Sequence, residues 1–189
     1  MATMEVKEIE TALLEQKEEF AASLEENYCT RPEEKLVDLN SKLAQVIIGV
    51  RRSGKSTLCF NVIKKSNLNF AYVNFDDERF AKIKTEDLNK ILECLYKIYG
   101  EFNHLFMDEI QNIEEWFLFV NRLLRTGMHV LITGSNAKLL SGELATRLAG
   151  RYVEFTIYPF SFSEFRSLYL LSHPQANDPE CFHQYLTLG

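Results

Sequence analysis

Residues 49–56 read Gly-Val-Arg-Arg-Ser-Gly-Lys-Ser, and these residue types at this spacing suit the binding of a phosphate chain. Glycines let the backbone curl so that successive N–H groups face an anion, and the positive end of a following helix points to the same place. The ammonium of Lys55 can reach the outer phosphates of a nucleotide, and the hydroxyl of Ser56 can bind Mg²⁺. We expect the nucleotide to be held by this loop and the residue after it: Gly49, Arg52, Ser53, Gly54, Lys55, Ser56 and Thr57.

A pair of adjacent carboxylates, Asp108 and Glu109, ends an apolar stretch about fifty residues after the loop. Hydrolysis of ATP needs one carboxylate that holds Mg²⁺ through its water shell and a base that orients the attacking water. Asp108 suits the first task and Glu109 the second, and a glutamate directly after the aspartate favours ATPases over nucleotide kinases. We therefore expect Glu109 and Lys55 to be catalytic, and Ser56 and Asp108 to hold the metal.

A third polar strand end follows in residues 131–136, which read Leu-Ile-Thr-Gly-Ser-Asn. In the strand order implied by the family resemblance given below, this strand lies between the loop strand and the Asp108 strand, so its end faces the γ-phosphate. Ser135 or Asn136 can then hydrogen-bond the attacking water or the γ-phosphate as a sensor. For Ser135, capping of the next helix is the alternative interpretation.

Four arginines near these motifs have roles that the sequence leaves open. Arg51 and Arg52 stand at variable positions of the loop, where they can contact nucleotide, pair with acidic neighbours or face solvent. Arg147 and Arg151 flank a Leu-Ala-Gly stretch, from which an arginine can insert into the nucleotide site of a neighbouring subunit. An intramolecular salt bridge competes with this interpretation. We favour Arg151 for the insertion and expect it to be catalytic.

Alternating strands and helices must position these residues. Short runs rich in Val, Ile, Phe and Tyr have the composition of buried parallel strands. We predict strands over 45–50, 70–75, 104–108, 129–133 and 152–157. Helices are predicted between them, over 54–66, 85–99, 113–126 and 137–148, and a last one over 161–171. This alternation indicates an α/β fold whose parallel sheet is covered by helices on both faces.

An acidic N-terminal segment precedes this alternation. Residues 1–35 hold ten glutamates against four basic residues, which accounts for the whole net charge of −6 and leaves the rest neutral. Apolar residues at helical spacing predict an amphipathic helix over 5–26, and Leu36, Leu39 and Leu43 predict a second, shorter helix after Thr30. The segment is expected either to pack on the core as a helical hairpin or to dock a partner.

Composition excludes several classes of protein. The neutral remainder gives no overall electrostatic footprint for nucleic acid, although it leaves a local basic groove open. No apolar run approaches the ~18 residues that span a bilayer. The four cysteines and four histidines show no metal-ligand spacing, so mostly buried, reduced thiols are expected. With no signal peptide visible, we expect a cytoplasmic protein without a membrane partner.

Residues of about 45–165 resemble an AAA+-like ATPase family that is widespread in archaea and bacteria. The matching stretches lie at 47–58, 106–112 with Trp116, 132–136, 145–152 and 158–165. The last of these, Tyr-Pro-Phe-Ser-Phe-Ser-Glu-Phe, and the Asp-Glu-Ile-Gln run from Asp108 are more specific than the phosphate loop, which many families share. The resemblance covers nearly two thirds of the chain.

This resemblance implies a three-layer P-loop NTPase with strand order 5-1-4-3-2 that uses ATP and Mg²⁺. It divides the chain into an acidic helical segment (1–43), a P-loop ATPase core (44–170) and the start of a truncated C-terminal region (171–189). The expected partners are ATP and ADP, with a second copy joined through the nucleotide interface as a possible third. Whether the client of the ATP cycle is a protein or a nucleic acid is left open by the sequence. We expect an AAA+-like motor or switch ATPase; the alternative is a nucleotide-binding regulatory module with negligible turnover.

Overall fold

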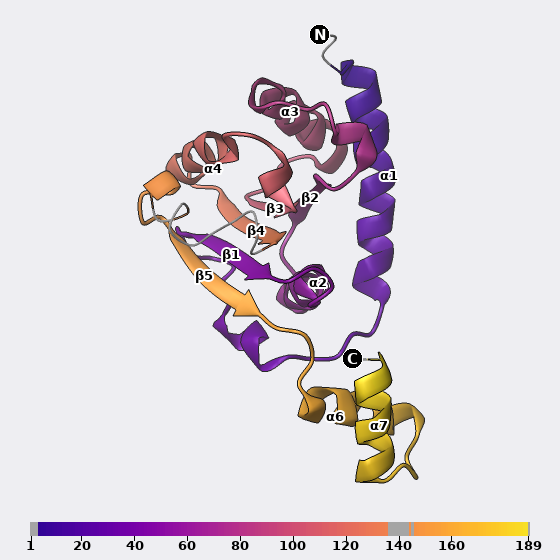
Figure 1. Ribbon diagram of the computed structural model, residues 1–189. Helices are drawn as coiled ribbons and strands as arrows, with labels where there is room; N and C mark the ends of the chain where they lie inside the picture. The colour runs from indigo at the N-terminus through magenta and orange to yellow at the C-terminus, as the bar shows by residue number, and fades with distance from the viewer. Residues whose placement is uncertain (1–3, 136–143, 145, 189) are drawn as a thin grey trace.

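Five parallel strands form the centre of the protein in the computed structural model, which describes residues 4–135, 144 and 146–188 (Figure 1). Their order across the sheet is β2-β3-β4-β1-β5, which confirms the predicted order. The strands are β1 (Ala44–Gly49), β2 (Phe70–Asn74), β3 (His104–Asp108), β4 (His129–Ser135) and β5 (Tyr152–Ile157). Because the chain leaves β1 for the far strand β2 and returns through β3 and β4, its direction reverses beside β1. Ligands of open α/β sheets bind at such a reversal, beyond the carboxyl ends of the strands.

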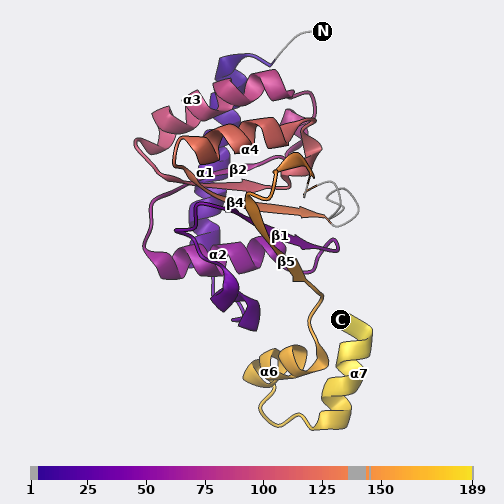
Figure 2. The ribbon, with the colours of Figure 1, turned by 90° about the vertical axis from the view of Figure 1, so that its left-hand side faces the viewer.

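Helices cover both faces of this sheet (Figure 2). Helices α3 (Leu88–Tyr99) and α4 (Trp116–Arg125) lie on one face, and α2 (Lys55–Ser66) lies on the other. The three helices confirm the predictions over 85–99, 113–126 and 54–66, although a 3₁₀ turn replaces the first predicted turn of α3, and α4 begins three residues later than predicted. Of the helix predicted over 137–148, residues 136–143 and 145 lie outside the described part of the chain.

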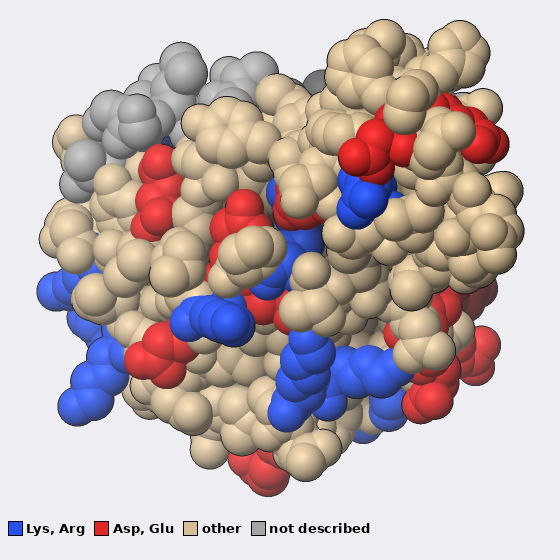
Figure 3. All heavy atoms as spheres, turned by 90° about the horizontal axis from the view of Figure 1, so that it is seen from below, with Lys and Arg blue, Asp and Glu red and all other residues tan. Residues whose placement is uncertain are grey.

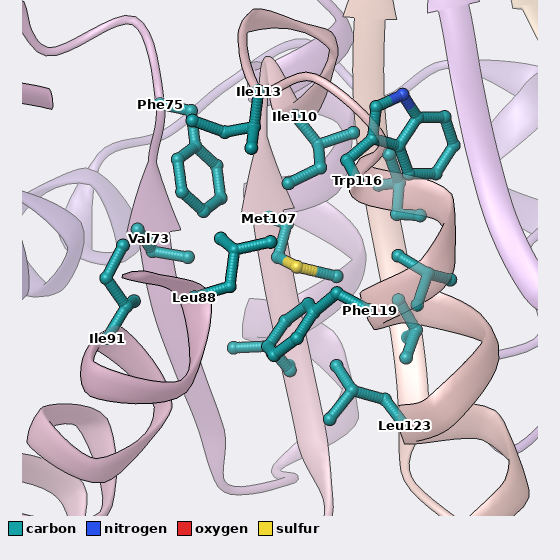
Figure 4. Close-up of a cluster of buried hydrophobic side chains, with 14 of the residues drawn as sticks. Val73, Phe75, Leu88, Ile91, Met107, Ile110, Ile113, Trp116, Phe119 and Leu123 are labelled. Atoms are coloured by element: carbon teal, nitrogen blue, oxygen red, sulfur yellow. The ribbon is translucent and has the colours of Figure 1, made fainter. Parts of the chain in front are cut away.

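The main core lies between the sheet and the α3 and α4 face (Figure 4). Met107 of β3 packs there among Leu88 of α3 and Trp116 and Phe119 of α4. Strands β1 and β3 are buried at every residue, as expected of parallel strands covered on both sides. Cys59, Cys94 and Cys181 are buried free thiols, as predicted for most of the cysteines.

Helix α1 (Val6–Glu25) runs along β2 and closes that edge of the sheet. Its buried residues recur at helical spacing, from Ile9 through Gln16 to Phe20. The side-chain amide of Gln16 donates to the Asn74 carbonyl (3.1 Å) and accepts from the Asn74 N–H (2.9 Å), as a neighbouring strand would. An open strand edge invites pairing with other chains, so α1 shields the sheet at β2.

The second predicted N-terminal helix is wrong, and with it the helical hairpin. Residues Pro32–Leu36 form only a 3₁₀ turn, and Leu36 is 60% exposed. The chain turns away after it because the Asp38 N–H donates to the side chain of Gln45 (3.1 Å) and the Asp38 carboxylate accepts from the Asn40 N–H. These contacts direct the chain into β1, which a continued helix would miss.

Beyond β5 the chain forms a pair of helices, α6 (Phe162–Ser172) and α7 (Asp178–Leu188), that extends away from the sheet (Figures 1 and 2). Helix α6 begins at the Ser161 cap and confirms the helix predicted over 161–171. Phe162 and Phe165 of α6 contact Tyr185 of α7 at ring-centroid distances of 5.7 and 5.5 Å. Within the described residues, we find no helix with the length and apolar character needed to cross a bilayer.

Candidate nucleotide-binding site

The loop between β1 and α2 has a curled backbone. Arg52 (φ 65°) and Gly54 (φ 86°) both adopt left-handed conformations within three residues. At Gly49 a Cβ atom would lie 2.2 Å from the Ile157 carbonyl oxygen and 2.6 Å from the Ser53 hydroxyl, so only glycine fits there. The loop is therefore pressed against the end of β5 and opens onto the first turn of α2, where an anion meets several N–H groups.

Lys55, the first residue of α2, is buried within this loop, with 5% of its surface exposed. Its ammonium nitrogen donates to the Val50 carbonyl (3.1 Å) and lies 3.6 Å from Oε1 of Glu109. A buried cation is costly without partners, and both partners here lie at the rim of the loop. The ammonium is thus held where a phosphate chain in the loop would meet it.

Three hydroxyl and carboxyl groups converge beside Lys55. Oδ1 of Asp108 accepts hydrogen bonds from the Ser56 hydroxyl (3.0 Å) and from the Thr133 hydroxyl. The Thr133 hydroxyl in turn accepts from the backbone N–H of Glu109 (3.0 Å), so this side chain of β4 orients both acidic residues. Burial raises the pKa of Asp108, and the hydrogen bonds from Thr133 and Ser56 oppose that shift.

Glu109 leaves the strand in a left-handed conformation (φ 52°), which an ordinary residue adopts only where its surroundings enforce it. Its side chain is 23% exposed, and Oε2 accepts a hydrogen bond from the Gln111 amide. The carboxylate therefore stands between Lys55 and Gln111 at the mouth of the loop. An oxygen so placed can accept a proton from a water molecule near the terminal phosphate.

Sequence reasoning missed the parts played here by Thr133, Gln111 and a third residue, Arg31. Thr133 lies within the 131–136 stretch, of which only the last residues, Ser135 and Asn136, were predicted to face the nucleotide. Its distance from Asp108 in sequence gives no hint of the contact, although the sheet order with β3 beside β4 does. Arg31 donates to the Ser53 carbonyl of the loop (3.0 Å) from a segment that composition assigned to an acidic arm.

The donor set fits a magnesium-bound nucleotide. A hydroxyl and a carboxylate, Ser56 and Asp108, are hard oxygen ligands, and Mg²⁺ takes its remaining ligands from water and phosphate. The described residues contain no cluster of three or more His, Cys, Asp or Glu side chains that could hold a metal by themselves. Among the described residues, the buried Ser53 hydroxyl has no hydrogen-bond partner, and the neighbours of Gly49 leave no room there for a side chain. These features suit a site completed by a polar ligand.

The remaining predicted residues lie at different distances from this site. Ser135, the last residue of β4, is paired in register with Gly49, the last residue of β1, so it lies at the same end of the sheet as the phosphate loop. Asn136 lies outside the described residues. Arg51 and Arg52 are exposed on the loop, and Thr57 is partly buried in the first turn of α2. No ion pair of Arg51 or Arg52 is found within the part of the chain that the structure describes.

Arg151 lies at the amino-terminal end of the parallel strands, whereas the phosphate loop lies at their carboxyl-terminal end. Its carbonyl accepts from the N–H of Ala44, the first residue of β1, whereas the loop starts at the last. Five steps of about 3.3 Å along β1 separate these ends by roughly 17 Å, which is beyond the reach of an arginine side chain. Arg151 lines a groove of about 620 Å³ with Arg122 and Arg125, and it has no carboxylate partner among the described residues. Arg147 lies over the ring of Phe117.

Charge on the face seen from below is mixed, with basic and acidic side chains next to one another (Figure 3). This mixture agrees with the neutral balance expected outside the N-terminal segment.

Comparison with known proteins decides the family. The profile of an AAA domain family matches residues 41–166, which include the whole sheet, the loop and the two carboxylates. The chain belongs to this AAA domain family. Membership makes it a nucleotide-binding P-loop domain of the AAA type and confirms the resemblance seen in the sequence.

Relatives of this AAA domain include two uncharacterised proteins. One, from Methanocaldococcus jannaschii, is 45% identical over 122 residues, which are 64% of this chain and 27% of the relative. The other, from Haemophilus influenzae, is 42% identical over 129 residues, 64% of this chain and 32% of the relative. The matched part is thus about a third or less of these relatives. A solved structure titled for katanin self-assembly is similar with a TM-score of 0.43 and 16% identity, covering 71% of this chain and 48% of that one.

Proposed function

We propose that this AAA domain binds ATP together with Mg²⁺ and hydrolyses the terminal phosphate. The observation that carries the proposal is the single hydrogen-bonded group formed by Ser56, Asp108, Thr133 and Glu109 beside the buried Lys55. It brings the Lys55 cation, two hard oxygen ligands and a carboxylate base together at the carboxyl ends of the strands. Phosphoryl transfer to water needs these components and little else from a protein.

Each residue has a separate task in this proposal. Backbone N–H groups of the loop hold the phosphates, and Lys55 neutralises charge on the outer two. Ser56 and Asp108 would hold a Mg²⁺ ion, which would supply positive charge to offset the charge that develops on the phosphates. Glu109 accepts a proton from the attacking water, while Ser135 hydrogen-bonds the water or the γ-phosphate. Thr133 keeps the two carboxylates in place for these tasks.

A second subunit would complete the reaction. Because Arg151 lies at the amino-terminal end of the strands, opposite the phosphate loop, it cannot reach the nucleotide of its own chain. Its exposed guanidinium has no carboxylate partner among the described residues, and Arg122 and Arg125 line the same groove. We propose that Arg151 reaches the γ-phosphate bound by a neighbouring copy, so that the nucleotide sits at the interface. An arginine supplied in this way increases phosphoryl transfer by about 10³ to 10⁵.

A nucleotide-binding module with negligible turnover is the second candidate. It is favoured by the Glu109 carboxylate being engaged by both Lys55 and Gln111. A carboxylate whose two oxygens are both occupied by protein partners is not free to accept from a water molecule. A chain that kept this arrangement with nucleotide bound would bind ATP without hydrolysing it.

Release of phosphate from ATP, followed at increasing concentrations of Mg²⁺ and of protein, tests the proposal and separates the two candidates. We expect Mg²⁺-dependent turnover by the chain and at least a hundredfold loss of turnover in Glu109→Gln. Asp108→Asn should weaken the Mg²⁺-dependent binding of ATP while leaving the loop intact. Binding of ATP with no turnover at any protein concentration would support the regulatory module instead.

A further inference from the structure

Arg31 connects three segments that are distant in sequence. Only 4% of its surface is exposed. Nη1 donates to the Ser53 carbonyl of the phosphate loop (3.0 Å) and to the Tyr158 carbonyl just after β5 (2.9 Å). Nε donates to Oε1 of Glu164 in α6 (3.0 Å). A single guanidinium therefore binds the phosphate loop, the end of the sheet and the first helix beyond it.

The segment that carries Arg31 is anchored on α2, the helix that begins in the phosphate loop. The backbone N–H of Arg31 donates to the Glu34 carboxylate (2.9 Å), which also accepts from Asn61 (3.0 Å) and Lys65 (2.6 Å). The ring of Phe160 stacks on the guanidinium at 5.1 Å from the ring centroid. The backbone of Arg31 is thus held by Glu34, and the plane of its guanidinium is held by Phe160. An arginine needs both constraints to orient a partner.

The Ser53 carbonyl belongs to the same peptide group as the N–H of Gly54. That group is planar and trans, so its C=O and N–H point in opposite directions. A donor on the Ser53 oxygen therefore fixes the direction of the Gly54 N–H. Gly54 has φ 86° and no side chain to restrict it, and its N–H belongs to the series that faces a phosphate.

A second set of contacts joins the same elements without Arg31. Gly49 at the start of the loop lies against the Ile157 carbonyl, where a Cβ would be 2.2 Å from the oxygen. Beyond β5, the Tyr185 hydroxyl of α7 donates to the Phe160 carbonyl (2.9 Å). The loop, the 157–164 segment and both C-terminal helices are therefore in continuous contact.

Glu164 is the charged partner of Arg31 on the C-terminal side. It also accepts hydrogen bonds from the N–H and hydroxyl of Ser161 at the start of α6. Although burial opposes the shift, these bonds and the charge of Arg31 hold the pKa of Glu164 below its ordinary value. The carboxylate is thus ionised at neutral pH, and the pair fixes the start of α6 relative to the loop.

We propose that Arg31 is a positioning residue that orients the Ser53–Gly54 peptide for phosphate and couples the loop to the α6–α7 pair. The inference rests on the proposed function, since it assigns a regulator of the same nucleotide site. Binding of ATP holds the peptide in the orientation that Arg31 already favours, and thereby stabilises the Arg31–Glu164 contact. Nucleotide binding at the loop consequently reduces motion in α6 and α7.

Two measurements test this proposal: calorimetric titration of ATP with Mg²⁺, and hydrogen exchange of residues 162–186 with and without saturating ATP. Arg31→Met is expected to weaken ATP binding by about tenfold, the effect of one hydrogen bond to a charged group, and to abolish ATP-dependent protection of α6 and α7. Glu164→Gln keeps the Ser53 contact, so it should change affinity by less than about twofold while losing the protection. Arg166→Met, which removes only the exposed Arg166–Asp178 pair (2.6 Å), is the matched control and should keep the ATP response of both readouts.

A purely structural role would lower the unfolding temperature of Arg31→Met without changing the dissociation constant of the folded protein. Equal affinity and equal protection in folded Arg31→Met would overturn the inference while leaving the proposed function standing. Absence of ATP binding by the unaltered chain would instead refute both. If Arg31→Met does not fold, Arg31→Lys decides, because it keeps the cation but not the fork. It should lose affinity by about fivefold, and unchanged affinity would contradict the proposal.

Discussion

The ammonium nitrogen of Lys55 lies 3.6 Å from Oε1 of Glu109, so the loop cation and the proposed catalytic base are partners in an ion pair. A phosphate chain in the loop must compete with this carboxylate for Lys55. We therefore predict that Glu109→Gln binds ATP more tightly than the unaltered chain, by up to about fivefold, since such an ion pair is worth roughly 0.2–1 kcal/mol. Titration calorimetry at fixed Mg²⁺ measures the difference.

Glu114→Gln is the matched control, because Glu114 is an exposed carboxylate on the same connection after β3. Its affinity for ATP should equal that of the unaltered chain. Weaker binding by Glu109→Gln would show that the glutamate helps to hold the nucleotide, contrary to the proposed division of tasks.

Thr133 supplies the second prediction. Replacement by valine keeps the shape but leaves Oδ1 of Asp108 and the N–H of Glu109 with one partner fewer, whereas serine keeps the hydroxyl. We expect Thr133→Val to raise the Mg²⁺ concentration needed for half-maximal ATP binding by about fivefold to a hundredfold, the effect of ~1–3 kcal/mol for an unsatisfied buried group. Thr133→Ser should stay close to the unaltered chain. Identical Mg²⁺ dependence in the valine and serine variants would remove Thr133 from the site.

A stacked pair of histidines makes stability depend on pH. The rings of His104 and His129 lie 4.7 Å apart on paired strands, and Nε2 of His104 is buried without a partner among the described residues. Burial, followed by the proximity of His129, lowers the pKa of His104 below its ordinary 6.5. As the pH falls below about 6.5, the unfolded chain takes up a proton that the folded chain refuses, so stability must fall.

Urea unfolding at pH 7 and pH 5.5 checks this expectation. The slope attributable to one group is at most about 1.4 kcal/mol per pH unit, and His104→Phe should flatten it while keeping the aromatic contacts. Asp77 and Glu164 have lowered pKa values, that of Asp77 being about 2. These two carboxylates change the free energy of unfolding only below about pH 4.5, so they do not affect the slope between pH 5.5 and 7. The exposed His183→Phe serves as control, and an unchanged slope in His104→Phe would contradict the assignment.

The position of Arg151 predicts catalysis between chains. Turnover should rise more than linearly with protein concentration, and Arg151→Ala should abolish that rise while leaving ATP affinity nearly unchanged. Mixing Arg151→Ala with Glu109→Gln chains should restore part of the activity, because one type of mixed interface carries an intact base and an intact arginine. If mixed oligomers form and the mixture stays inactive, the arginine does not act on a neighbouring site.

The sequence predicted what depends on local pattern. The spacing of Gly49, Gly54 and Lys55 identified the loop, and apolar runs located each strand to within two residues. The order of the strands came from resemblance to a family, because periodicity alone does not say which strands are neighbours. The second N-terminal helix was wrong since Leu36, Leu39 and Leu43 fit a helical face, while the contact between Asp38 and Gln45 that turns the chain is tertiary.

Residues whose roles arise from contacts across the fold could not be found this way. Thr133 meets Asp108 only because β4 lies beside β3, 25 residues later in the chain. Arg31 is 22 residues from Ser53 and 133 from Glu164, and nothing in its local sequence separates it from a solvated arginine at the end of an acidic segment.

Binding of ATP to the loop is the central claim, and calorimetric titration of ATP with Mg²⁺ into the unaltered chain and into Lys55→Ala tests it most directly. We expect binding by the unaltered chain and a tenfold to hundredfold weaker affinity in Lys55→Ala, which loses a charge-assisted contact worth ~1.5–3 kcal/mol. The exposed Lys82→Ala is the control and should bind as tightly as the unaltered chain. Equal affinity in Lys55→Ala and Lys82→Ala, or no binding by the unaltered chain, would contradict the account.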